Sequence, residues 1–265
     1  MTAQDMVAGA GADTGQDRIA PTWRRLFGRP IAVVVGLAIA YGVFLTLTGT
    51  PDDSTVLNEP FLVNRLLGHL LLSGVSFAVV VVTCVPLGVL LAVTGRPLRA
   101  VVFPLANLGQ AVPGIGVVAL LYAFLGIGVT PVIIALIAFS ALPVLRNTMV
   151  GIMGVDPAAV QAARGMGMTR WQALQRVQIP LASPLIFAGL RTSLVLIIGT
   201  ATLGTFIGGG GLGDVISAGI NISDRIVFVG AVMVAALALL ADWALSLVEF
   251  AVVPRNARVQ PHRSR

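Results

Sequence analysis

Long runs of apolar residues, separated by short polar segments, restrict this chain to a membrane environment. Of its 265 residues, 57% are hydrophobic and only 11% are charged, well outside the balance of water-soluble proteins. A helix of about 20 apolar residues spans a bilayer, and six runs have a length near or above this value. The runs cover residues 31–47, 70–93, 101–127, 131–150, 184–207 and 226–253. We therefore predict an all-α polytopic membrane protein with about six transmembrane helices.

Prolines interrupt several of these runs. They are Pro86, Pro104, Pro113 and Pro143. Proline lacks a backbone N–H and clashes with the carbonyl of the preceding turn, so it kinks or breaks a helix. In lipid the freed carbonyls need partners on neighbouring helices. We expect kinks or breaks at these positions, inside a packed bundle.

Arginine provides every basic residue, since the sequence holds no lysine, and the net charge is +6. In a soluble protein this charge would suggest nucleic-acid binding, but in a membrane protein the preference of arginine for cytoplasmic segments explains it. The arginine-rich segments contain Arg18, Arg24, Arg25, Arg29, Arg96, Arg99, Arg146, Arg164, Arg170, Arg176, Arg255, Arg258, Arg263 and Arg265. The segments between them contain Asp52, Asp53, Glu59, Asp214 and Asp224, with Arg65 and Arg225. This alternation predicts that both termini are cytoplasmic.

The two ends of the chain differ from its apolar middle. Residues 1–30 lack hydrophobic periodicity, which predicts a disordered cytoplasmic tail. Residues 31–64 are expected to hold the first transmembrane helix and an extracellular loop. A secretory signal peptide is the alternative for this run, although no clean cleavage site follows it. The main transmembrane domain is expected over residues 65–253, and residues 254–265 form a second cytoplasmic tail.

A long polar segment between the fourth and fifth runs carries the clearest local signals. Asp156 followed by Pro157 predicts a helix N-terminus, because Asp caps a helix and Pro suits its first position. Gly165 and Gly167 then permit a turn. The segment is therefore expected to begin with a short helix that ends near residue 165.

A second short helix is expected after this turn. Thr169 and Gln172 have the spacing of a capping box, and Pro180 is expected to end the helix. Ser183 and Pro184 repeat the cap and proline signal, which would start the next span. The second helix would present one apolar face, which needs a partner or the body of the protein. That face consists of Trp171, Leu174 and Val177.

The same segment resembles the EAA loop of bacterial ABC importer permeases. Residues 161–163 (Gln-Ala-Ala), Gly167 and residues 177–180 (Val-Gln-Ile-Pro) match its pattern without a gap. That pattern is Glu-Ala-Ala, three residues, Gly, nine residues and Ile-x-Leu-Pro. Gln161 stands where Glu is usual, and Ile179 stands where Leu is usual. The amide of Gln161 can still form hydrogen bonds, but it lacks the charge of a carboxylate. The resemblance implies that the loop couples the permease to an ATPase through Gln161, Ala162, Ala163, Gly165, Gly167, Trp171, Leu174, Val177, Ile179 and Pro180.

The resemblance extends over about residues 65–250 and narrows the family to osmoprotectant permeases, which import glycine betaine, carnitine or choline. It is carried by residues 110–115 (Gln-Ala-Val-Pro-Gly-Ile), 142–148 (Leu-Pro-Val-Leu-Arg-Asn-Thr), 165–171, 199–203 and 208–214. Within these segments the candidate pore or gate residues are Pro113, Asn147, Thr200, Thr202, Gly208, Gly211 and Asp214. Permeases for an amino acid such as methionine, or for a sulfonate, share the loop and are the alternative.

The resemblance implies several partners. They are a cytoplasmic nucleotide-binding ATPase subunit, a second permease in a homodimer or heterodimer, and an extracytoplasmic substrate-binding protein. ATP and Mg are expected in the ATPase, whereas this chain would hold no cofactor, metal or catalytic residue. The chain is expected in the bacterial cytoplasmic membrane.

The remaining polar features permit several interpretations. Residues 208–214 (Gly-Gly-Gly-Gly-Leu-Gly-Asp) lack the Lys-Ser or Lys-Thr of a phosphate loop, and we interpret them as an extracellular turn or gate with Asp214 available as a helix cap. Arg191, Asp242 and Glu249 lie in spans, where charge is costly. They could serve substrate or proton coupling. Alternatively, Arg191 could snorkel, Glu249 lies near a helix end, and Asp242 could pair internally.

Other classes of protein find little support. Cys84, His69 and His262 are too few and too separated for a disulfide or a metal site. No aromatic cage for a quaternary ammonium group is visible in the spans, which agrees with substrate recognition by a separate binding protein. An intramembrane enzyme would need a convergent polar set. A passive channel would have no use for a coupling loop.

Overall fold

The computed structural model describes residues 23–47, 51, 53–94 and 96–253, and every regular element among them is helical. The tails expected over most of 1–30 and over 254–265 lie outside the described residues. The elements are α1 (Trp23–Thr46), α2 (Asp53–Val56), α3 (Glu59–Thr94), α4 (Arg96–Ala111), α5 (Gly114–Leu125), α6 (Val129–Met153), α7 (Pro157–Gly165), α8 (Arg170–Ala173), the π-helical turn η3 (Leu174–Gln178), α9 (Ile179–Thr200), the 3-10 helix η4 (Ala201–Ile207), α10 (Leu212–Ile222) and α11 (Asp224–Val252).

Four helical segments of the described chain are long and apolar enough to cross a membrane. They are α3, α6, the continuous segment Arg170–Ile207 and α11. The pair α4 and α5 supplies a fifth as a broken span. The all-α membrane fold is thus confirmed. The first expected span corresponds to α1, whose described apolar part runs over Val34–Phe44, and its crossing stays a prediction.

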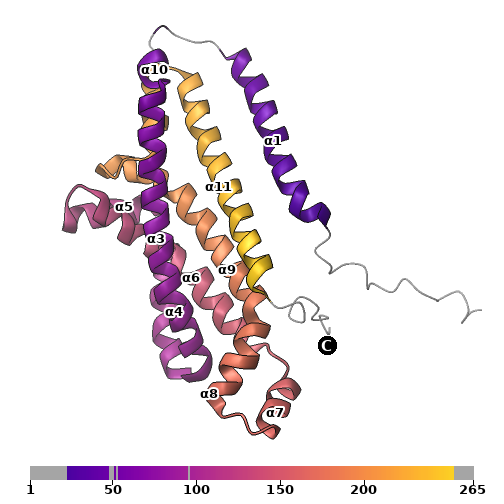
Figure 1. Cartoon of the computed structure of the whole chain (residues 1–265). Coiled ribbons are helices and arrows are strands. Elements are labelled where there is room, and N and C mark those ends of the chain that lie inside the picture. Colours follow the sequence, from indigo (N-terminus) through magenta and orange to yellow (C-terminus); the bar gives the residue numbers. More distant parts are fainter. Residues whose placement is uncertain (1–22, 48–50, 52, 95, 254–265) are drawn as a thin grey trace, which may run out of the picture.

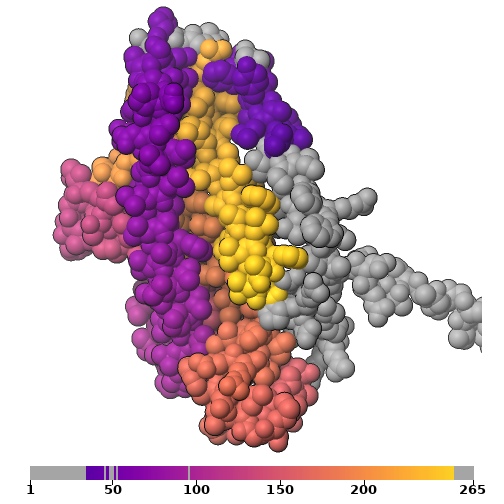
Figure 2. Space-filling model, viewed as in Figure 1, coloured from indigo at the N-terminus to yellow at the C-terminus, as the bar shows by residue number. Residues whose placement is uncertain are grey.

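The third expected span is not continuous. Residues 101–127 were expected to form one run, but α4 and α5 meet at an angle of 101°. The break lies at Pro113, whose carbonyl accepts hydrogen bonds from the N–H groups of Gly116 and Val117 at the start of α5. In Figures 1 and 2, α5 therefore projects sideways from the bundle. The helices continue through Pro86, Pro104 and Pro143, so proline alone did not decide where a helix breaks.

The core lies among α3, α6 and α9. Its buried apolar side chains include Leu72 and Val80 of α3, Leu136 and Val144 of α6, and Ile197 of α9. Small residues bring these helices close, as is common in membrane proteins. A Cβ on Gly189 of α9 would lie 2.8 Å from the Cβ of Asn147 on α6, and one on Gly88 of α3 would lie 2.7 Å from the Cβ of Thr148.

The two ends of the bundle carry different elements. At one end, α7 and α8 extend below the spans, and at the other end α10 lies beside the start of α3 (Figure 1). The helix α3 connects the two ends, since its 36 residues span about 54 Å. Outside the core, α1 packs along α11. The predicted coupling segment and the predicted gate therefore lie far apart, and α3 and α9 are the elements that reach towards both.

Candidate coupling site and gate

The coupling segment begins with a capped helix, as the sequence predicts. The Oδ1 atom of Asp156 accepts a hydrogen bond of 2.8 Å from the N–H of Ala158, and Pro157 occupies the first position of α7. At the other end of α7, the N–H of Gly167 donates to the carbonyl of Arg164 at 3.0 Å. These local bonds fix both ends of a nine-residue helix.

Gly167 makes the turn between α7 and α8. Its φ is +85°, a conformation that costs little for glycine but strains a residue with a side chain. A Cβ at this position would meet no atom within 4 Å. The requirement for glycine is thus conformational, not steric. Gly165, in contrast, has helical geometry and equally open surroundings.

The helix after the turn is longer than the sequence predicts. The capping box is present, because the N–H of Gln172 donates to Thr169 Oγ1 at 3.2 Å and the N–H of Thr169 donates to Gln172 Oε1 at 2.9 Å. The helix does not end at Pro180, however, and this prediction was wrong. It passes through the π-helical turn η3 into α9 and forms one segment from Arg170 to Ile207. The wider turn directly before Pro180 relieves the clash that its ring would make in a regular helix.

Ser183 and Pro184 also lie inside α9 and do not begin a new span. Pro184 has no N–H for the carbonyl of Pro180, one turn earlier. The hydroxyl of Ser183 donates to that carbonyl at 2.7 Å instead. The predicted cap was therefore wrong, because the serine repairs the interior of a helix. As a consequence, the coupling helix α8 is continuous with a membrane span.

The surface of the coupling segment divides into a buried and an exposed side. Ala163 is 1% exposed and Leu174 is 3% exposed, with Val177 half-buried beside them. Leu174 belongs to the buried apolar core and attaches the segment to it, whereas α7 packs against α8 and η3. Trp171 is 61% exposed and Met166 is 73% exposed. The expected apolar face is thus shared between the body of the protein and the surface. Met166 was not predicted as a coupling residue. Its position between two glycines of a turn could have indicated an exposed apolar side chain.

The remaining predicted coupling residues lie in the same segment. Gln161, Ala162 and Gly165 are exposed on α7, and Ile179 and Pro180 are half-buried where η3 passes into α9. Figure 2 shows this segment as the end of the molecule beyond the spans. The structure therefore brings together all ten residues that the resemblance assigns to coupling.

The predicted gate is a tightly packed glycine turn between η4 and α10. Gly208, Gly210 and Gly211 have φ values of +73°, +76° and +88°. A Cβ on Gly211 would lie 3.0 Å from Nδ1 of His69, and a Cβ on Gly213 would collide with the carbonyl of Thr202. This turn needs glycine for both conformation and space, unlike the turn at Gly167.

His69 of α3 anchors the turn from within the bundle. Its side chain is fully buried, and Nδ1 accepts a hydrogen bond of 3.3 Å from the N–H of Leu212, the first residue of α10. Because Nδ1 is the acceptor, Nε2 carries the proton and donates to the carbonyl of Ile198 at 3.0 Å. One imidazole thereby joins α3, α9 and α10. From the sequence, His69 was weighed only as a metal ligand, which its separation from the other candidates argued against, and this contact was not predicted.

An ion pair holds the same turn from its other side. Arg65 Nη1 lies 2.7 Å from Asp214 Oδ2, and the hydroxyl of Thr205 donates to Asp214 Oδ1 at 2.6 Å. Asp214 does not cap α10: the N-cap is Gly211, which makes no side-chain cap bond. The expectation of a capping aspartate was wrong, because its carboxylate turns towards Arg65 and Thr205.

Other predicted pore residues are spread over the bundle. Pro113 is exposed at the break before α5, and a Cβ on the adjacent Gly114 would lie 3.5 Å from Thr200. Thr202 donates to the carbonyl of Gly199 at 2.7 Å. Asn147 packs against Gly189, where α6 crosses α9, away from the glycine turn. The structure thus groups Pro113 with Thr200, and Thr202 with the glycine turn, but leaves Asn147 apart; their part in a pore stays a prediction.

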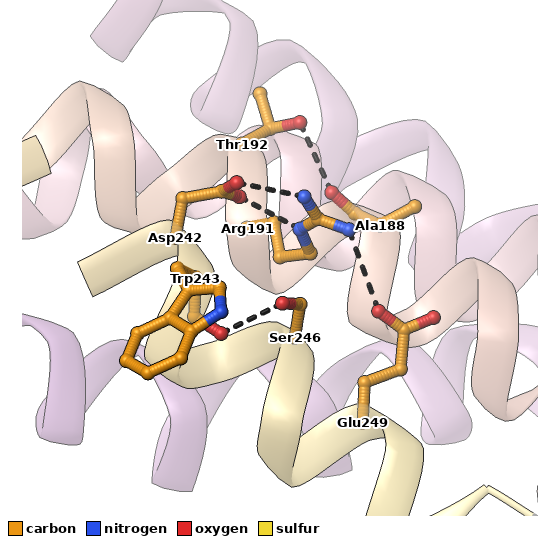
Figure 3. Close-up of polar contacts among 7 residues, drawn as sticks. All are labelled: Ala188, Arg191, Thr192, Asp242, Trp243, Ser246 and Glu249. Atoms are coloured by element: carbon orange, nitrogen blue, oxygen red, sulfur yellow. Dashed lines mark hydrogen bonds and ion pairs between the residues drawn. The ribbon is translucent and has the colours of Figure 1, made fainter. Parts of the chain in front are cut away.

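The charges inside the spans form one network between α9 and α11 (Figure 3). Arg191 donates from Nε to Asp242 Oδ1 at 2.7 Å and from Nη2 to Asp242 Oδ2 at 2.8 Å. Its Nη1 atom lies 3.5 Å from Glu249 Oε2. The expected internal pairing of Asp242 is present, and Arg191 is its partner, so Arg191 pairs within the bundle and has no need to snorkel.

These features describe a helical membrane subunit with a structured segment for a partner at one end and a constrained turn at the other. Residues 84–253 match the family described as binding-protein-dependent transport system inner membrane component. Since the match covers more than half of the chain, the protein belongs to this family of multi-pass inner-membrane transport subunits.

Individual relatives agree with this assignment. The carnitine transport permease protein OpuCD of Listeria monocytogenes (strain 10403S) is 39% identical over 208 residues, 77% of this chain and 92% of the relative. The glycine betaine/carnitine/choline transport system permease protein OpuCB of Bacillus subtilis is 42% identical over 189 residues, 71% of this chain and 87% of the relative. The choline transport system permease protein OpuBD of the same organism is 40% identical over 201 residues, 74% of this chain and 88% of the relative.

Solved structures show the same fold. An inward-facing structure of the MetNI methionine ABC transporter aligns with a TM-score of 0.67 at 24% identity, over 75% of this chain and all of the matched chain. An amino acid ABC transporter crystallised with histidines aligns with a TM-score of 0.63 at 21% identity, over 77% of this chain and all of the matched chain.

Proposed function

We propose that this chain is the membrane subunit of an ATP-driven importer for a quaternary ammonium osmoprotectant, such as glycine betaine, carnitine or choline. The observation that carries the mechanism is the continuous helix from Arg170 to Ile207, which joins the coupling segment to the glycine turn. The substrate class rests on the relatives, whose names specify carnitine, glycine betaine and choline. The chain supplies the path, and a partner supplies the energy.

The coupling segment is suited to transmit a mechanical movement. Both α7 and α8 begin with satisfied N-caps, and Leu174, directly after α8, is buried in the core. A cytoplasmic ATPase would contact the exposed side around Met166 and Trp171. When its two nucleotide-binding subunits close on ATP, the segment moves as a rigid unit, and α9 carries that movement to η4 and the glycine turn.

Further subunits complete the importer in this proposal. A second permease would cover the apolar side chains that α5 exposes, among them Tyr122, Phe124 and Leu125. A substrate-binding protein would dock at the end that carries the glycine turn. The distribution of arginine along the sequence supports a cytoplasmic position for the coupling end and for both termini in this proposal. ATP and Mg would bind only to the ATPase subunit.

Uptake measurements test this proposal. Cells that lack other transporters for these solutes would express the chain with its ATPase and its binding protein. Uptake of labelled glycine betaine, choline, carnitine, proline and methionine would be measured at two osmolarities. We expect uptake of the quaternary ammonium solutes, abolished by an ATPase subunit that binds but does not hydrolyse ATP. Uptake that persists with this subunit would overturn the mechanism.

Methionine-like amino acids or sulfonates are the second candidate class of substrate. The observation behind this candidate is that the solved structures with this fold belong to transporters of methionine and of another amino acid. ATP-dependent uptake of methionine alone, or of a labelled sulfonate added to the same assay, would retain the importer mechanism and replace the osmoprotectant.

A further inference from the structure

In the ion network between α9 and α11, Arg191 contacts its two carboxylate partners with unequal geometry. Arg191 and Asp242 form a bidentate pair with distances of 2.7 and 2.8 Å, close to the best geometry for these groups. The contact between Arg191 and Glu249, at 3.5 Å, is at the limit of a hydrogen bond. Arg191 therefore binds Asp242 through two strong hydrogen bonds and contacts Glu249 only weakly.

The two carboxylates are placed for alternate use by the same arginine. Asp242 and Glu249 are seven residues apart on α11, so they share one face of the helix and are separated by about two turns, or roughly 10 Å. Arg191 lies between them and already contacts both (Figure 3). Transfer of the bidentate pair to Glu249 would need a displacement of α9 along α11 of no more than about one turn, roughly 5 Å.

The network is open on one side, next to Arg191 and Asp242. An open pocket of about 480 Å³ adjoins it. The pocket is lined by Ala188, Arg191, Thr192, Val195, Leu196 and Asp242. The guanidinium and the carboxylate thus border free volume on one side, whereas the packed core lies on the other. The pair of Arg191 and Asp242 can therefore separate without displacing core side chains on this side, and Glu249 lies outside the pocket.

We propose that Arg191 is a positioning residue that exchanges its bidentate partner between Asp242 and Glu249 during the transport cycle. This inference rests on the proposed coupling function, because Arg191 lies on the same continuous helix as the coupling segment. With Asp242 as partner, α9 has the register seen in the structure. With Glu249 as partner, α9 is displaced towards the C-terminal end of α11.

Neutral variants of the two carboxylates test the exchange. Asp242→Asn removes the present partner, and Glu249→Gln removes the alternative one, while both preserve shape. We expect each variant to lower the substrate imported per ATP hydrolysed by about tenfold, equivalent to about 1.4 kcal/mol. The two variants should stop in opposite registers. If Arg191 only clamps the helices, Glu249→Gln transports normally, because a contact of 3.5 Å contributes little, and the proposal fails.

A cross-linking assay reports the register without transport. Cysteines replace Val195 on α9 and Leu239 on α11, both exposed, in a chain with Cys84→Ala. In the assembled complex, Asp242→Asn and Glu249→Gln should change the rate of cross-linking in opposite directions, about threefold each. Equal rates in both variants overturn the proposal.

The control is Arg191→Lys, which keeps the charge but loses the bidentate geometry. When Arg191→Lys is added to each carboxylate variant, the two double variants should differ less in cross-linking rate than the two single variants do. If the wild-type complex imports none of the tested solutes, the proposed substrate fails. The cross-linking rates of the two carboxylate variants still decide whether the exchange occurs, because that assay needs no substrate.

Discussion

The two glycine turns of this protein differ in what holds them. Gly167, in the coupling segment, is surrounded by open space, and its helices are capped by residues within three positions in the sequence. Gly211, in the candidate gate, touches His69, which lies more than a hundred residues away. The coupling turn is thus a local structure attached to the surface, whereas the gate is assembled from distant helices. The first can move as a unit, and the second changes only if the packing around it changes.

Among substitutions in the two glycine turns, the largest effect on stability should come from adding a side chain to the gate turn. Gly211→Ala places a methyl group 3.0 Å from His69 in a residue with φ of +88°. We expect a loss of about 2–4 kcal/mol in the free energy of unfolding, from overpacking together with backbone strain. Thermal unfolding in detergent measures it. Gly165→Ala is the matched control, because its Cβ meets nothing within 4 Å, and equal stability of the two variants would contradict the comparison.

Removing the charge of Asp214 should have the next largest effect. Asp214→Asn breaks the ion pair with Arg65 and weakens the bond from Thr205, so we expect a loss of about 1–3 kcal/mol in stability. The variant with exchanged charges, Arg65→Asp with Asp214→Arg, should recover part of this loss. A fully stable Asp214→Asn protein would show that the ion pair does not hold the gate turn.

A substitution at the coupling turn should uncouple more than it unfolds. Gly167→Val forces a β-branched residue to a φ of +85°, at a local cost of about 1–3 kcal/mol, and distorts the angle between α7 and α8. We expect ATP hydrolysis to continue while uptake falls about tenfold. Gly165 has no positive φ, so we expect the Gly165→Val variant to retain more uptake than Gly167→Val. Normal uptake by Gly167→Val would refute the coupling role of this turn.

The smallest effect on stability should come from Trp171→Ala. This side chain is largely exposed, so its removal should change the free energy of unfolding by less than about 0.5 kcal/mol. Co-purification with the ATPase should nevertheless weaken, because exposed tryptophans often dominate interfaces. Leu174→Ala is the contrasting variant, since it removes buried volume and should destabilise the chain itself by about 2–5 kcal/mol. Unchanged ATPase binding by Trp171→Ala would remove it from the proposed interface.

Much of the coupling segment could be predicted because its signals are local. The cap at Asp156, the box of Thr169 and Gln172, and the turn at Gly167 each depend on neighbours in the chain. The errors arose at Pro180 and Pro184, which usually end a helix. A π-helical turn and the hydroxyl of Ser183 accommodate them instead. Proline rules treat the backbone alone, so they miss repair by a neighbouring side chain.

The sequence by itself determined the membrane environment, the helical class and the capped coupling segment, because apolar length and helix caps act over one or two turns. Only the tertiary structure decided the break at Pro113, the role of His69, and the pairing of Arg191 with Asp242. Each of these depends on which helices lie side by side. In a bundle of uniformly apolar helices, that arrangement follows from close packing of small residues and from a few buried polar contacts between residues far apart in the chain.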